Sequence, residues 1–171
     1  SLVIPSALAL ASAITKDASG LWLSLTRRTV SLAWLFLSIG IVLGGNWAYI
    51  ELGWGGFWAW DPVENSSFFP WLIVTALVHT TMVQKKRGTL KLWNVFLAAL
   101  AYALTVFGTF LTRSGVVQSV HAFASSDVGW VFLTYLGIFA LAALLAMFFI
   151  GIFLLFFLLL HLTSLIVLLV V

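Results

Sequence analysis

The sequence predicts an all-α, polytopic membrane helix bundle with a tryptophan-rich loop on its outer face. Of the 171 residues, 63% are hydrophobic and only 8% are charged, whereas soluble domains carry about 25% charged residues. Apolar segments alternate with short polar ones along the chain. Within a bilayer each helix can satisfy its own backbone polar groups. The composition therefore excludes an ordinary soluble domain and indicates membrane lipid as the surrounding partner. The net charge of +3 comes from a few loop residues and does not indicate a nucleic-acid-binding face.

Residues 1–28 are expected to be the tail of a truncated transmembrane helix followed by a basic inner loop. The apolar stretch 1–14 is too short to cross a bilayer alone, since a span needs about 20 residues. Lys16, Arg27 and Arg28 give the loop its positive charge.

Three full transmembrane spans are predicted next, over about residues 29–49, 66–84 and 92–112. The second and third spans are separated by a short basic loop, residues 85–91. The positive-inside rule places both basic loops on the inner side of the membrane. The aromatic loop, residues 51–65, and the histidine loop, residues 113–127, then share the outer side, where they can build one site.

The last apolar run, residues 129–171, is longer than one span requires. Gly151 is the one hint of a break in it. The run is expected to be one transmembrane segment, two segments that abut at Gly151, or a pair from which a loop is missing. His161 lies in this run and is either a helix-packing residue or a second intramembrane ligand.

The aromatic loop contains Trp54, Trp58 and Trp60, together with Phe57 and two glycines, within a few residues. Tryptophan is enriched at membrane interfaces, but an anchoring belt needs only scattered rings. Flat rings beside glycines, which permit close backbone approach, suit a large planar ligand such as heme. The composition of the loop is compatible with both an interfacial anchor and a heme platform.

The run from Asp61 to Glu64 is typical of a helix start. Asp61 is the expected N-cap, Pro62 the first helical residue and Glu64 the reciprocal member of a capping box. Capping alone accounts for both acids, although Glu64 could also contact a ligand.

Two histidines and one arginine are further candidates. His79 lies inside the second span, where an ionisable group is costly and is by default a functional candidate; neutral imidazole can ligate heme iron or bond a neighbouring helix. His121, in the histidine loop, is either solvated or a ligand. Arg113 either snorkels to the interface or pairs with a carboxylate such as a heme propionate. The chain has no Cys, which excludes thiol catalysis by its own residues.

Residues 53–71 resemble the tryptophan-rich WWD signature of the heme-handling proteins of cytochrome c biogenesis. The stretches 108–115 and 119–124 are similar to one branch of that family, the CcmF-type cytochrome c heme lyase subunits with their close relative NrfE. The resemblance covers residues 29–132, which would form the WWD-type heme-handling core. It departs from the signature at Phe57, where the family has the first of two tryptophans.

The resemblance implies a heme lyase component that acts in a complex during cytochrome c maturation. It would receive heme from a CcmE-type heme chaperone and promote thioether attachment to the Cys-x-x-Cys-His motif of apocytochrome c, beside CcmH-type thiol-handling subunits. Heme b would serve both as substrate and as a bound redox cofactor, and no residue of the chain is an evident general base. The residues implied for the outer heme site are Trp54, Trp58, Trp60, Asp61, Glu64, Arg113 and the iron ligand His121.

The resemblance further implies that His79 ligates a membrane heme b that acts as reductant, with His161 as a candidate partner. The implied location is a bacterial inner membrane with the aromatic loop in the periplasm, or a mitochondrial inner membrane with the loop in the intermembrane space. Two rival functions remain: a membrane heme carrier without ligation activity, and a b-type electron-transfer subunit. His79 favours the lyase over a simple carrier.

Overall fold

The structure, a computed structural model, describes residues 2–15, 20–53, 56–122 and 127–170, except for the side chains of residues 150, 153, 154, 157 and 160–170. Within these residues the regular structure is helical: α1 Val3–Thr15, α2 Leu21–Ile50, α3 Pro62–Arg87, α4 Lys91–Ser114 and α5 Val128–Val170. Among the described residues, four helices are long and apolar enough to cross a membrane. The prediction of an all-α, polytopic membrane bundle is confirmed.

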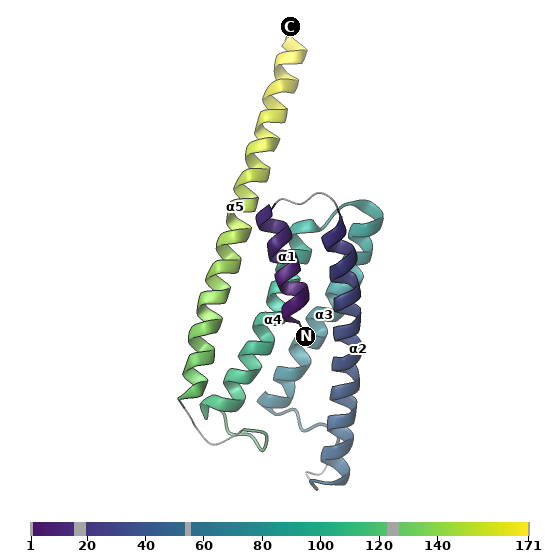
Figure 1. Ribbon diagram of the computed structural model, residues 1–171, viewed down its shortest axis with the longest axis vertical. Coiled ribbons are helices and arrows are strands. Elements are labelled where there is room, and N and C mark those ends of the chain that lie inside the picture. The colour runs from purple at the N-terminus through teal and green to yellow at the C-terminus, as the bar shows by residue number, and fades with distance from the viewer. Residues whose placement is uncertain (1, 16–19, 54–55, 123–126, 171) are drawn as a thin grey trace.

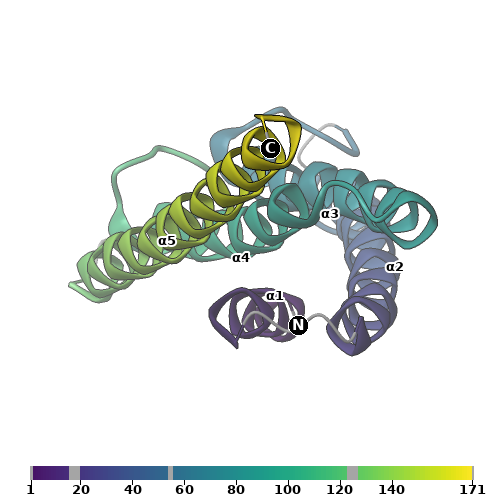
Figure 2. The same cartoon turned by 90° about the horizontal axis from the view of Figure 1, so that it is seen from above.

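Successive helices run in opposite directions and pack side by side (Figure 1). Seen along the bundle, α5, α4 and α3 form a row, and α1 lies to one side of it near α2 (Figure 2). The short helix α1 packs against α2 and α4 and lies in the half of the bundle far from the aromatic loop (Figure 1). The aromatic and histidine loops emerge at the same end, and the α3–α4 turn lies at the opposite end (Figure 1).

One boundary differs from the expected one, and for the last apolar run the structure has the single-segment alternative. Helix α2 begins at Leu21, after Gly20 in the left-handed region (φ 70°), so Arg27 and Arg28 lie in the helix and not in a loop. Leucine and arginine are good helix formers and no proline or glycine interrupts this stretch. Helix α5 is continuous through Gly151, since a lone glycine costs a helix only about 1 kcal/mol and no polar break accompanies it.

Small and medium-sized apolar side chains form the contact between the inner helices. Ala98 and Ala101 of α4, Val74 and Leu77 of α3, and Ala9 of α1 are almost fully buried and belong to one apolar cluster. In lipid, helix association depends on close packing, which small residues permit. This cluster holds α3 in place. The first turn of α3 lies at the end of the bundle where the aromatic and histidine loops emerge (Figure 1).

The join between α4 and α5 gives a testable packing constraint. A Cβ added at Gly129 would lie 2.5 Å from Ser114 Cα, whereas one at Gly137 meets nothing within 4 Å. Gly129→Ala is therefore expected to destabilise the protein by about 1–3 kcal/mol, the usual cost of overpacking. Gly137→Ala, in the same helix, is the matched control and should not lower the thermal unfolding midpoint in detergent. Equal midpoints for the two variants would contradict this packing.

Candidate functional site

The end of the aromatic loop is held by the first turn of α3. Asp61 is the N-cap, and its Oδ1 accepts hydrogen bonds from the backbone N–H groups of Val63 (2.7 Å) and Glu64 (3.0 Å). Pro62 occupies the first helical position. The expected N-cap is confirmed, and it fixes the Asp61 carboxylate to the helix.

Glu64 departs from the expected capping box. Its Oε2 accepts a hydrogen bond from the backbone N–H of Ala59 at 2.7 Å, two residues before the cap. The reason is the backbone of Trp60, which adopts φ 60° and turns the chain so that the N–H of Ala59 faces Glu64. The Trp60 carbonyl accepts a bond from Asn65 Nδ2 at 3.0 Å. Such a conformation costs a non-glycine residue about 1–3 kcal/mol, and these two bonds hold it.

Removing the Glu64 carboxylate should loosen the aromatic loop. A hydrogen bond to a charged group contributes about 1.5–3 kcal/mol, so in Glu64→Ala the Ala59 amide should exchange its hydrogen roughly tenfold to a hundredfold faster. Glu64→Gln keeps an acceptor oxygen and should lie between this variant and wild type. Glu51→Ala, an exposed acid at the end of α2, is the matched control. Hydrogen exchange read by mass spectrometry over residues 56–62 measures the effect, and unchanged rates in Glu64→Ala would contradict it.

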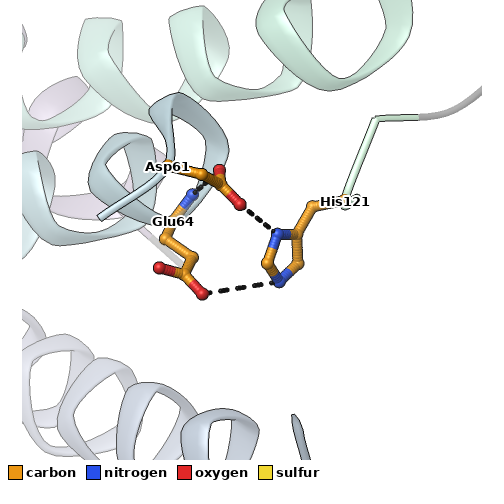
Figure 3. A group of neighbouring side chains, drawn as sticks. All are labelled: Asp61, Glu64 and His121. Atoms are coloured by element: carbon orange, nitrogen blue, oxygen red, sulfur yellow. Dashed lines mark hydrogen bonds and ion pairs between the residues drawn. The ribbon is translucent and has the colours of Figure 1, made fainter. Parts of the chain in front are cut away.

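His121 reaches Asp61 across 60 positions of sequence. Its Nδ1 lies 2.6 Å from Asp61 Oδ2, and its Nε2 lies 3.9 Å from Glu64 Oε1 (Figure 3). The three side chains are partly buried, and one ligand atom from each lies within 4.8 Å of the others. The structure therefore brings together three of the residues expected in the outer site.

The charge of Asp61 follows from its surroundings. Burial by itself raises the pKa of the carboxyl, but hydrogen bonds from the Glu64 backbone, from His121 and from the Val63 backbone outweigh it and leave the pKa below 3.8. The carboxylate is ionised at neutral pH and can only accept hydrogen bonds. The Nδ1 of His121 is consequently the donor of the 2.6 Å bond.

A large apolar cavity opens beside this cluster. Its volume is about 850 Å³, within the range of roughly 300–1,000 Å³ typical of small-molecule sites. Phe57 and Trp58 of the aromatic loop line it, as do Glu64 and His121. Along α2 it is lined by Phe36, Gly40, Gly44, Gly45, Trp47 and Ala48. An apolar cavity with an imidazole and aromatic rings in its lining is a candidate site for a large planar ligand such as heme.

Gly45 lets the aromatic loop close onto α2. A Cβ there would lie 2.7 Å from the carbonyl oxygen of Phe57, so a larger residue would displace the loop. The Phe57 ring stacks on Tyr49 of α2 at a centroid distance of 4.4 Å. These contacts hold one wall of the cavity in place.

Trp58 also begins a series of aromatic contacts that descends along α3. Its ring meets Phe68 edge-on at 6.0 Å, Phe68 stacks on Trp71 at 5.5 Å, and Trp71 stacks on Trp34 of α2 at 6.2 Å. Both partly buried indole N–H groups donate across the helix interface, Trp71 to Ser38 Oγ and Trp34 to Thr75 Oγ1, each at 2.8 Å. The aromatic wall is thus braced by both helices.

Other expected site residues lie at the edge or outside this arrangement. Trp60 is 72% exposed and meets Trp58 edge-on at 6.5 Å, but does not line the cavity. Arg113 is exposed in the last turn of α4, at the same end of the bundle. Trp54 lies outside the described residues.

The structure places His79 far from the outer cluster. It follows Asp61 by 18 positions on α3, which is about 27 Å along the helix axis. The imidazole is exposed on the outward side of the helix, and Nδ1 donates to the Thr75 carbonyl at 2.7 Å. His161 belongs to α5, and its side chain lies outside the described residues. His79 and His121 are therefore too far apart to belong to one site.

Sequence reasoning missed the α2 wall of the cavity and the partners of Trp58. Phe36, Gly40 and Gly44 recur every four residues, which places them on one face of the helix, and paired glycines at this spacing indicate close approach in a membrane. Phe68 and Trp71 are three apart on α3 and so also share a face. These spacings are the signals that could have identified both sets.

Comparison with known proteins gives consistent matches. The family model described as "Cytochrome C assembly protein" matches residues 6–121. "Cytochrome c-type biogenesis protein CcmF" of Haemophilus influenzae is 55% identical over 131 residues, which are 76% of this chain and 20% of that protein. "Cytochrome c-type biogenesis protein NrfE" of the same organism is 54% identical over 108 residues, 63% of this chain and 17% of that protein.

A solved structure is also similar. The protein titled "Cytochrome c Heme Lyase CcmF" superposes with a TM-score of 0.71 at 43% sequence identity, covering 85% of this chain and 23% of that one. The chain spans about a fifth of the length of the curated relatives that it matches.

Proposed function

Because this chain belongs to the cytochrome c assembly protein family, in its CcmF-type branch, we propose that it provides the outer heme site of a cytochrome c heme lyase. In this proposal the site accepts heme from a CcmE-type chaperone and holds it while thioether bonds form with the Cys-x-x-Cys-His motif of apocytochrome c. The observation that supports it best is His121, paired with Asp61 and Glu64 beside an apolar cavity of about 850 Å³.

The residues of the site have distinct tasks. His121 ligates the iron through Nε2, and Trp58 with Phe57 forms the aromatic wall. Glu64 holds the loop backbone at Ala59. Trp54, Trp60 and Arg113 are proposed as further heme contacts, with the Arg113 guanidinium paired with a propionate.

The proposed chemistry is mainly positioning. Each thioether forms when a thiol adds across a heme vinyl group: a C–S bond forms, the thiol hydrogen passes to the neighbouring carbon, and no net electrons are exchanged. Holding vinyl carbon and thiol sulfur in contact replaces a bimolecular encounter with a near-attack geometry. The thiols come from the substrate, in keeping with the absence of Cys in this chain.

His79 is proposed to hold a separate heme b within the membrane, with His161 as its candidate partner. Its Nδ1 donates to the Thr75 carbonyl, which in the neutral ring leaves the lone pair on Nε2. A histidine held in this way fits an axial ligand. A b-type heme bound there would supply the electron that keeps incoming heme iron reduced.

The proposed setting is an inner membrane, bacterial or mitochondrial, with the aromatic and histidine loops on the outer side. Lys85, Lys86, Arg87 and Lys91 cluster at the opposite end of the bundle, which supports this orientation through the positive-inside rule. CcmH-type thiol-handling subunits are the further proposed partners.

The experiment that tests the proposal is reconstituted heme transfer. Full-length protein containing this segment, heme-loaded chaperone and reduced apocytochrome c are mixed, and the pyridine hemochrome spectrum is followed. Lyase activity should shift the absorbance from that of a vinyl heme to that of a thioether heme. Transfer without that shift would contradict the proposal and identify a heme carrier instead.

A further inference from the structure

We propose that Asp61 acts through His121 as a positioning residue: it fixes the ring so that Nε2 faces the heme iron, and it strengthens that nitrogen as an electron donor. The inference rests on the proposed function, because it assigns Asp61 a role toward the same heme. It differs from the role as a direct heme contact that the family resemblance implies.

The hydrogen bond to Asp61 determines the tautomer of His121. Asp61 Oδ1 accepts from two backbone N–H groups, and its Oδ2 lies 2.6 Å from Nδ1 of His121; a carboxylate engaged in this way is an acceptor, so the proton of the 2.6 Å contact belongs to Nδ1. With the proton on Nδ1, the lone pair of the neutral ring is on Nε2, the nitrogen that heme iron requires. That edge of the ring is turned toward Glu64, which lines the cavity together with His121 (Figure 3).

Asp61 itself is anchored at the start of α3. Its two carboxylate oxygens have separate partners: Oδ1 accepts from the N–H groups of Val63 and Glu64, and Oδ2 accepts from His121. Because the first oxygen is fixed to the start of α3, the second has a defined position. The helix cap therefore also serves as the support of the imidazole.

The loop that carries His121 forms a turn at Ser119. The His121 backbone N–H donates to Ser119 Oγ at 3.0 Å, and the Ala122 N–H donates to the Ser119 carbonyl at 3.1 Å. This turn presents the imidazole, and Asp61 ties it to the aromatic loop. The hydrogen bond from His121 to Asp61 thus connects the proposed iron ligand with the end of the aromatic loop.

The chemical consequence follows from the charge. A carboxylate that accepts from the far nitrogen of a ligating histidine orients the ring and raises the basicity of the ligand, and losing such a partner typically lowers metal affinity about 10–100-fold. The added negative charge stabilises ferric more than ferrous iron. Asp61 should accordingly tighten heme binding and lower the midpoint potential of heme at this site.

The test compares Asp61→Asn with wild type and with Glu51→Gln in the full-length protein. Asparagine caps a helix as well as aspartate, so α3 should keep its start. Glu51 is an exposed acid at the other end of the aromatic loop and controls for the lost charge. To isolate the outer site, all variants carry His79→Ala, and the probe is hemin.

In Asp61→Asn we expect hemin affinity to fall about 10–100-fold, the ferrous iron–histidine stretching frequency to drop and the midpoint potential to rise, while Glu51→Gln stays at the wild-type values. In the heme-free protein, ring ¹⁵N shifts of His121 should report a protonated Nδ1 in wild type and a tautomer mixture in Asp61→Asn. This second measurement needs no heme.

The outcomes separate the two proposals. If hemin binds and depends on His121 but Asp61→Asn equals Glu51→Gln in every measurement, the role of Asp61 is overturned and the proposed function stands. If hemin does not bind, or binds equally well to His121→Ala, the outer heme site itself is overturned. Unchanged ring ¹⁵N shifts in Asp61→Asn would overturn the tautomer assignment in either case.

Discussion

His121→Ala is expected to abolish covalent heme attachment and to leave holocytochrome c at background. The imidazole is the proposed iron ligand, so its removal should weaken hemin binding at the outer site by at least the roughly 10–100-fold that follows the loss of an outer-shell partner. The measurement is heme staining of cytochrome c in a strain complemented with the variant, together with hemin titration of the purified protein.

A matched control for this variant lies in the same loop. Gln118 is exposed three positions before His121, and Gln118→Ala should support wild-type amounts of holocytochrome c. The membrane heme b spectrum should survive in His121→Ala, because His79 lies about 27 Å farther along α3. Normal cytochrome c formation in His121→Ala would exclude the imidazole as the essential ligand.

His79→Ala is expected to remove the low-spin b-type signal from the reduced-minus-oxidised spectrum and to stop maturation. The physical reason is the loss of an axial ligand within the membrane, which removes the proposed source of electrons for incoming heme. Hemin titration at the outer site should remain at wild-type affinity. The two histidine variants should therefore fail at different steps.

The reductant role of His79 can be separated from mere structural damage. Addition of dithionite to the reconstituted reaction should restore thioether formation in His79→Ala but not in His121→Ala. Met82→Leu, at an exposed position one turn beyond His79 on α3, is the control and should retain the heme b signal. An unchanged spectrum in His79→Ala would remove it as a ligand and shift weight to a carrier whose heme is bound only at the outer end.

The sequence predicts local features of the site well. The start of α3 after Asp61 follows from short-range chemistry, since Asp is favoured at the N-cap and Pro at the first helical position. The meeting of His121 with the aromatic loop follows from counting spans, because two crossings return the chain to the same side. Neither prediction required knowledge of how the helices pack.

Other parts of the site depend on tertiary geometry and were not predictable. The bond from Glu64 to Ala59 exists because Trp60 adopts a positive φ, which tryptophan rarely does. The α2 residues that line the cavity could not be identified from the sequence either. In a membrane helix, lipid-facing and cavity-facing residues are alike apolar, so hydropathy does not separate Phe36 from its neighbours.

One continuous helix supports both proposed iron positions, and this has a mechanical consequence. His79 is part of α3, and His121 is hydrogen-bonded to Asp61, the N-cap of that helix. The separation of the two proposed iron sites would then be set mainly by the rise of α3 between Asp61 and His79. Deleting one residue of α3 between them would shorten the helix by about 1.5 Å and rotate His79 by roughly 100° relative to Asp61. This change of helix register should uncouple the proposed electron donor from its acceptor, while each site still binds its own heme.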